Sequence, residues 1–132
     1  MKISASIKNS FHQNEIVVQT DEDAKVMAIA PKPAGYGSSV NGAELLLLSL
    51  ATCFCNDIYR EAVKRDIAVS EVEVVFTGEF GKEGEPGSDF QYKANVVTDA
   101  PAEVIEELIK HTDNIAEIHN TLRKGVNIIL TQ

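Results

Sequence analysis

The chain has 132 residues, of which 44% are hydrophobic and 24% are charged, and its net charge is -8 at pH 7. These proportions are those of an ordinary globular protein, and the length fits a single domain spanning residues 1–132. Because binding to DNA or RNA requires a basic face, the acidic balance excludes nucleic acid as the expected partner.

The start of the chain carries no recognisable signal peptide. Residues 1–8 (MKISASIK) alternate between polar and apolar side chains and contain no continuous apolar stretch. Two cysteines in a chain without an export signal fit reduced thiols better than a structural disulfide. We therefore expect a cytoplasmic protein.

The first part of the chain predicts three strands and a loop. Residues 3–7 alternate between apolar and polar side chains, which is typical of a half-buried strand. Residues 15–20 (EIVVQT) complete a hairpin with that strand, and residues 25–30 (KVMAIA) form a third strand. Residues 31–41 contain two prolines, two glycines and two serines, so we expect a loop there.

A long helix is predicted next, over residues 42–65. Asn41 is a good N-cap, and Glu44 lies three residues later, where a capping box places a carboxylate. The first half of the helix is apolar on nearly every side, so we expect it to be fully enclosed and the second half to lie on a surface. Its apolar stretch is shorter than the roughly 20 residues of a membrane span, and no membrane contact is expected.

The second half of the chain predicts an antiparallel strand pair, two helices and a last strand. Residues 71–80 and 90–98 both alternate between apolar and polar side chains and flank a glycine-rich loop. Strands that come in antiparallel runs, without βαβ repeats, indicate the α+β class. The expected elements that follow are helices at 101–111 and 115–122 and a strand at 126–130.

The apolar first half of the long helix requires cover on every side. One sheet covers only one face of a helix, and a chain of 132 residues has little material left for the others. A second copy of the chain is the simplest source of that cover, and two-fold dimers are the commonest oligomers. We therefore expect a homodimer.

The stretch from Asn41 to Phe54 resembles the central helix of the OsmC/Ohr family. The matching residues are Asn41, residues 44–46 (ELL) and residues 51–54 (ATCF), and the order of the elements is similar over essentially the whole chain. This resemblance implies an intertwined homodimer with two long helices packed at its centre. It also implies a relation to enzymes that reduce organic hydroperoxides or hydrogen peroxide.

The resemblance further implies a set of functional positions. Characterised members use a reactive cysteine on the central helix, a resolving cysteine near the C-terminus, and an arginine and a glutamate that activate the first thiol. Cys53 falls on the reactive position, whereas Ala116 stands at the resolving one. The activating glutamate aligns with Ala43, one residue from Glu44, and residues 9–14 of the first hairpin contain no arginine. The chain therefore resembles a divergent member that keeps one of the four positions.

The residues around Cys53 on its own helix offer little to activate a thiol. Cys53 lies about three turns inside the helix, where the helix dipole barely reaches. Asp57, one turn further on, would raise the pKa of the thiol, and a buried cysteine can equally be a small apolar core residue. Cys55 lies about 200° around the helix from Cys53, so we expect no disulfide, no metal site and no other cofactor.

A charged group from another element could still activate the thiol. Candidates for such a cation are His12 in the first hairpin, Arg60 and Arg123. Glu44 is a helix cap in one interpretation and a member of the thiol site in another, and His119 on the short helix is expected to face the site. The candidate catalytic residues are therefore Cys53, with Glu44, His12 and His119 in secondary roles.

Two functions follow from these observations. In the first, Cys53 attacks an organic hydroperoxide, becomes a sulfenic acid and is regenerated by an external thiol, because no resolving cysteine is present. In the second, the protein is a non-catalytic homodimer that binds a small apolar molecule at its interface. A different thiol chemistry on the same scaffold is a third interpretation. We favour an OsmC-like protein whose peroxidase activity is absent or much reduced.

Overall fold

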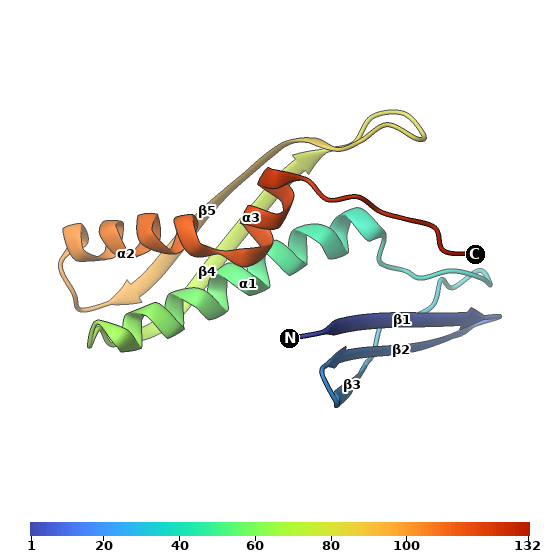
Figure 1. Cartoon of the computed structure of the whole chain (residues 1–132), viewed down its shortest axis with the longest axis horizontal. Helices are drawn as coiled ribbons and strands as arrows, with labels where there is room; N and C mark the ends of the chain where they lie inside the picture. Colours follow the sequence, from blue (N-terminus) through green and yellow to red (C-terminus); the bar gives the residue numbers. More distant parts are fainter. The chain divides into compact units, whose positions relative to one another are not determined.

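The computed structural model describes residues 1–132 and divides into two compact units, Met1–Leu45 and Leu46–Gln132. Helices and antiparallel strands both contribute, which confirms the α+β class (Figure 1). The expected single domain over the whole chain stays a prediction. The elements in chain order are β1 (Ile3–Ser10), β2 (Gln13–Thr20), β3 (Asp23–Met27), α1 (Gly42–Lys64), β4 (Val69–Glu79), β5 (Ser88–Thr98), α2 (Ala102–Ile115) and α3 (Glu117–Lys124).

The first unit is a three-stranded antiparallel sheet in the order β1-β2-β3. Ile16 of the central strand pairs with Ile7 on one side and with Met27 on the other, and it is buried. All residues of β1 are exposed, so the expectation of a half-buried first strand is wrong for the single chain. The physical reason is that, among the helices and strands, β1 contacts only its neighbouring strand β2, and no other element packs on the face of the sheet to cover its side chains.

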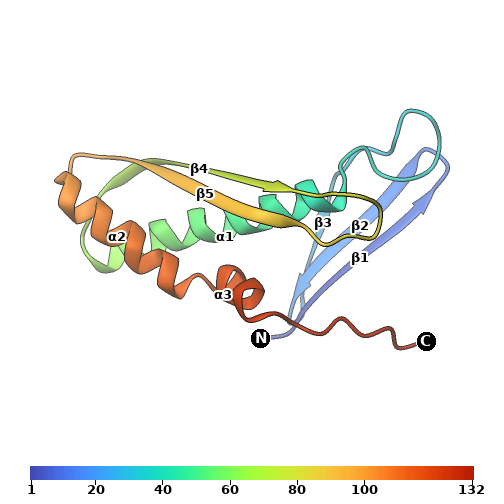
Figure 2. The same ribbon diagram turned by 90° about the horizontal axis from the view of Figure 1, so that it is seen from above.

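The second unit packs its helices on one face of the β4–β5 hairpin. Figure 2 shows the hairpin on one side and α1, α2 and α3 on the other. Alternate residues of both strands point toward the helices, as their alternating sequence predicted. The buried core consists of Phe54, Ile58 and Ala62 of α1, Leu108 of α2 and Ala116, packed against strand residues such as Val72, Val74, Tyr92 and Val96.

The start of α1 confirms the predicted capping box. The side chain of Asn41 accepts a hydrogen bond from the Glu44 amide at 2.8 Å, and the carboxylate of Glu44 accepts one from the Asn41 amide at 3.0 Å.

None of the three helices combines the length and the apolar character that a membrane span requires.

In the single chain, α1 is buried mainly on one side of its second half. All of its buried residues except Leu50 lie in the second half, from Phe54 to Ala62, where the hairpin and the two later helices cover it. In the first half, Leu45, Leu46 and Leu47 are only half-buried and Leu48 is 57% exposed. A single copy therefore leaves the first half partly uncovered, because the hairpin and the later helices pack near the other end. The enclosure of the first half by a second copy of the chain stays a prediction.

The last strand expected at residues 126–130 is absent. The chain has no regular secondary structure after α3, and all residues from 125 to 132 are exposed. A strand exists only where a neighbour satisfies its backbone hydrogen bonds, and no strand of this chain pairs with that segment. The apolar run therefore has strand composition without a strand partner.

Candidate functional site

Cys53 lies on α1 against the first turn of α3. Its thiol is half-buried, and Sγ donates a hydrogen bond to Oδ2 of Asp57, one helical turn later, at 3.6 Å. The backbone N–H of Ile118, in the first turn of α3, hydrogen-bonds to the same sulfur. The thiol therefore has an acceptor on its own helix and a donor from another helix.

The surroundings of Cys53 favour the protonated thiol. Burial is the main cause and raises its pKa above the ordinary value of 9.0. The negative charges of Asp57 and Glu117 raise it further, whereas the hydrogen bond from the Ile118 amide lowers it. The net shift is upward, so little thiolate is present at neutral pH.

Asp57 connects the thiol to a guanidinium. Its side chain is buried, with Oδ2 facing Cys53 and Oδ1 held by Nη1 of Arg60 at 3.0 Å. Burial raises the pKa of the Asp57 carboxyl, and the positive charge of Arg60 opposes that rise. Arg60 thus acts on the thiol through Asp57, as one of the cations that the sequence indicated.

Arg60 is itself fixed by a second carboxylate. Its Nε contacts Glu61 at 3.1 Å, and Glu61 also accepts hydrogen bonds from Lys64 at 2.8 Å and from His111 of α2 at 2.9 Å. Hydrogen bonds from Lys64, Arg60 and His111 lower the pKa of Glu61 to about 2. This cluster joins α1 to α2 and holds the guanidinium next to Asp57.

Three side chains of metal-binding type meet at this point. The sulfur of Cys53 and carboxylate oxygens of Asp57 and Glu117 lie within 4.8 Å of one another. Arg60 already supplies positive charge to Asp57, which opposes the entry of a cation. We therefore describe the trio as a thiol site, and the expected absence of a metal stays a prediction.

His119 points into an aromatic cage between α1 and the hairpin. Its ring stacks on Phe54 with centroids 5.5 Å apart and meets Phe76 and Tyr92 edge-on. Neither ring nitrogen has a hydrogen-bond partner in the protein, and burial lowers the pKa of the imidazole. The structure places His119 near the site without a polar contact to Cys53, so its catalytic role stays a prediction.

The other residues that the sequence proposed for the thiol site contact other parts of the protein. Glu44 closes the helix cap, and His12 lies in the turn of the first hairpin, where its ring stacks on Phe11 at 4.0 Å. Arg123 holds the carboxylate of Asp113 at 2.7 Å, and Asp113 also accepts a hydrogen bond from Tyr92. Of the candidate cations, only Arg60 contacts a partner of the thiol.

Two features of the site are missing from the sequence analysis: the Ile118 amide and Glu117. Both come from the start of α3, directly after Ala116. Ala116 is the residue at the resolving position of the resembled family, and this was the signal that could have pointed to the start of α3.

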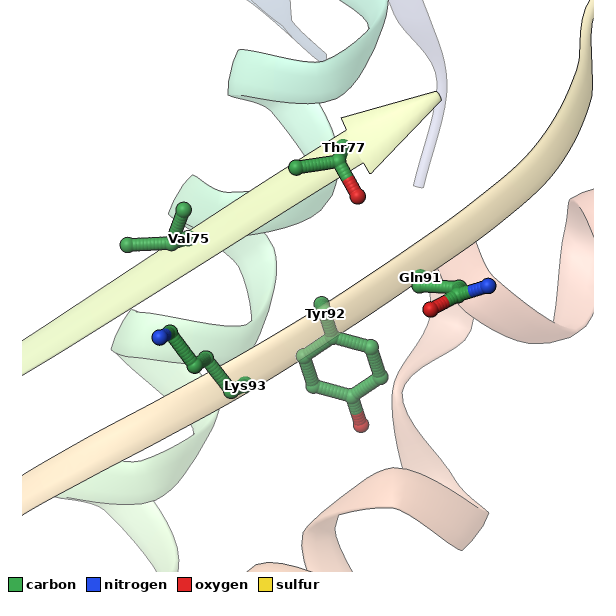
Figure 3. A pocket seen from close by; sticks show the side chains of 5 residues that line it. All are labelled: Val75, Thr77, Gln91, Tyr92 and Lys93. Atoms are coloured by element: carbon green, nitrogen blue, oxygen red, sulfur yellow. The ribbon is translucent and has the colours of Figure 1, made fainter. Parts of the chain in front are cut away.

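A surface hollow elsewhere in the unit carries no comparable chemistry. It has a volume of about 260 Å³ and lies over β4 and β5 (Figure 3). Its lining contains neither a thiol nor a carboxylate, so the candidate chemistry lies with Cys53. The lining residues are Val75 and Thr77 on β4 and Gln91, Tyr92 and Lys93 on β5.

Fold and site together define an α+β protein in which the half-buried thiol of Cys53 lies on a long helix, against the start of a later helix. The family model described as OsmC-like protein matches residues 35–131. The chain belongs to the OsmC-like family, which confirms the resemblance seen in the sequence. No curated protein sequence matches the chain.

Solved structures show the same fold. An OsmC-like protein from Mycoplasma pneumoniae has a TM-score of 0.62 at 19% identity, covering 92% of this chain and 86% of that one. An OsmC-like hydroperoxide resistance protein from Jannaschia sp. has a TM-score of 0.54 at 16% identity, with coverages of 96% and 88%. An organic hydroperoxide resistance protein OsmC from Legionella pneumophila has a TM-score of 0.56 at 15% identity, with coverages of 89% and 89%. At these identities the likeness shows the fold.

Proposed function

We propose that the protein is a one-cysteine, thiol-dependent organic hydroperoxide reductase of low activity, with Cys53 as the reacting thiol. Family membership supports this proposal, and two structural neighbours carry the name hydroperoxide resistance protein. The observation that carries it is the sulfur of Cys53, set between the carboxylate of Asp57 and the backbone N–H of Ile118.

The chemistry requires one thiol and an external reductant. The sulfur attacks the distal oxygen of the hydroperoxide, the O–O bond breaks, and the products are an alcohol and the sulfenic acid of Cys53. One external thiol then forms a mixed disulfide with release of water, and a second thiol reduces that disulfide. Ala116, fully buried at the resolving position, offers no sulfur to replace the external thiol.

Low activity follows from the protonation of the thiol. The thiolate is the nucleophile, and the pKa of Cys53 is raised by burial and by two neighbouring carboxylates. Only the Ile118 amide opposes this shift, where an activated site would place a cation against the sulfur. The substrate class that fits a half-buried thiol is a small organic hydroperoxide.

We also propose that the protein works as a homodimer. Large apolar side chains of both units lie exposed on the single chain, and a second copy of the chain would cover part of them. The proposal predicts twice the monomer mass in light scattering, and a monomer mass at all concentrations would reject it. The exposed apolar side chains include Ile3 and Ile7 of β1, Leu48 of α1, and Ile128, Ile129 and Leu130 near the C-terminus.

The cytoplasmic location expected from the sequence stays a prediction.

The activity is tested with purified protein and cumene hydroperoxide. We expect Cys53 to form a sulfenic acid and to consume the peroxide in the presence of a small thiol. The variant Cys53→Ser should lose both, whereas Cys55→Ser serves as the matched control and should keep both. Alkylation of Cys53 followed against pH should give a thiol pKa above the ordinary value.

The alternative function would follow from the opposite result. If Cys53 forms no sulfenic acid and peroxide consumption is the same in the wild type and in Cys53→Ser, the enzyme proposal is wrong. The raised pKa of the thiol favours that alternative, a non-catalytic homodimer that binds a small apolar molecule at its interface.

A further inference from the structure

The position of Asp57 gives it a second capacity besides raising the pKa of the thiol. We propose that Asp57 is a catalytic residue that accepts the thiol proton of Cys53 and delivers it to the alkoxide leaving the hydroperoxide. This inference rests on the proposed reductase function. It assigns to one side chain the transfer of the thiol proton to the leaving group, a step that only an alkoxide leaving group requires.

The geometry places Asp57 in contact with the reacting atom. Its Oδ2 accepts the hydrogen bond from Sγ at 3.6 Å, within the range of thiol hydrogen bonds. The two residues lie one turn apart on the same helix, so the contact is fixed by the helix itself. No other side chain forms a hydrogen bond with this thiol.

Arg60 holds the carboxylate in one orientation. Nη1 of its guanidinium lies 3.0 Å from Oδ1 of Asp57, so Oδ2 faces the thiol. Glu61 holds the guanidinium in turn, with its Oε2 at 3.1 Å from Nε of Arg60. The side chain of Asp57 is buried, so water competes little for its oxygens. Arg60 is therefore a positioning residue for the proton acceptor.

Asp57 is also able to hold a proton during the reaction. Its pKa is raised, chiefly by burial and further by the charges of Glu117 and Glu61, whereas Arg60 and the thiol hydrogen bond lower it. General acid–base catalysis works best with a group whose pKa is shifted toward the operating pH.

The step balances without any further reactant. The proton of Sγ moves to Oδ2 of Asp57, and the sulfur electron pair forms a bond to the distal, OH-bearing oxygen of the hydroperoxide. The O–O bond breaks, and the alkoxide takes the proton from Asp57 as it leaves as an alcohol. Sulfur is oxidised to a sulfenic acid, the peroxide is reduced, and Asp57 returns to its carboxylate form.

A competing role for Asp57 is purely electrostatic suppression of the thiolate. The two roles predict opposite effects of Asp57→Asn on alkyl hydroperoxides. If Asp57 only raises the pKa of the thiol, the variant should react faster with every electrophile. If Asp57 transfers the proton, the variant should react more slowly only where the leaving group needs one.

The experiment compares three reagents on Cys53 in single-turnover reactions at pH 7. Iodoacetamide releases iodide and peroxyacetic acid releases a carboxylate, so neither leaving group requires a proton, whereas cumene hydroperoxide releases an alkoxide that does. For Asp57→Asn we expect alkylation and peroxyacid reduction at least as fast as in the wild type, and cumene hydroperoxide reduction about 100-fold slower. Circular dichroism and the alkylation rate establish that the variant is folded.

Glu117→Gln is the matched control for charge alone. Glu117 raises the pKa of Cys53 without a hydrogen bond to the sulfur, so its neutralisation should speed all three reactions together. A cumene hydroperoxide rate in Asp57→Asn equal to or above that of the wild type would overturn the inference, and so would an equal loss with all three reagents. A wild type that reduces no hydroperoxide would overturn the proposed function as well, so the two failures are distinguishable.

Discussion

The buried imidazole of His119 predicts a substitution that stabilises the protein. The side chain is only 4% exposed, and neither ring nitrogen has a hydrogen-bond partner in the protein. Aromatic rings of Phe54, Phe76 and Tyr92 surround it. We expect His119→Leu to raise the free energy of unfolding, because an apolar side chain suits this cage better than an unpartnered imidazole.

The size of the effect follows from two opposing contributions. A buried polar group without a partner costs about 1–3 kcal/mol, and the loss of ring contacts costs about 0.5–1.5 kcal/mol. We therefore expect a net gain of about 1 kcal/mol at pH 8, or a rise in melting temperature of about 4 °C for a chain of this size.

The stability that His119→Leu gains over the wild type should increase as the pH falls. Burial lowers the pKa of His119 in the folded protein below its ordinary value of 6.5. Below pH 6.5 the imidazole is protonated in the unfolded chain but stays neutral in the folded protein. The wild type therefore loses stability as the pH falls, by up to about 1.4 kcal/mol per pH unit. The variant has no imidazole at this position and avoids that loss.

Urea denaturation followed by circular dichroism at pH 8 and pH 5.5 measures both effects. His12→Asn is the matched control, because His12 is exposed and asparagine tolerates its left-handed backbone (φ 56). A His119→Leu variant that is less stable at both pH values would refute the reasoning. A gain of the same size at both pH values would show that the imidazole titrates normally in the folded protein.

Three further predictions concern stability. Leu108→Ala should cost about 2–5 kcal/mol in urea denaturation because Leu108 is fully buried in the core, whereas Val104→Ala on the same helix, 37% exposed, should cost less than about 1 kcal/mol. Asn41→Ala should cost about 0.5–2 kcal/mol by removing the cap of α1, and an unchanged urea midpoint would show that the cap is replaceable. Glu61→Gln should lower the urea midpoint at pH 6 more than at pH 3. The pKa of Glu61 is lowered from 4.5 to about 2, so its stabilisation is complete above pH 4.5 and is lost as the pH falls toward 2.

Local signals in the sequence predicted most of the elements. The capping box of Asn41 and Glu44 placed the start of α1, since both hydrogen bonds join residues three positions apart. Alternation placed β4 and β5 to within two residues at each end, because every second side chain faces the same core. The short helix begins at Glu117 and not at residue 115, a shift typical of helix ends.

Long-range contacts decided the features that sequence reasoning misplaced. The apolar pattern of α1 predicts that it is buried, but only the packing of the hairpin and the later helices determines which half they cover. Residues 126–130 have strand composition and yet no strand, since a strand depends on a partner that composition does not supply.

The sequence indicated some residues of the candidate site, and only the tertiary structure added the others. The sequence alone indicated the family, the candidate cysteine Cys53 and its neighbour Asp57, because a spacing of four residues on a helix brings two side chains together. The tertiary structure alone decided that the Ile118 amide and Glu117 reach the same sulfur from α3, more than sixty residues away in the chain. The physical reason is that helix geometry acts over one turn, whereas the approach of a second helix depends on how the whole core packs.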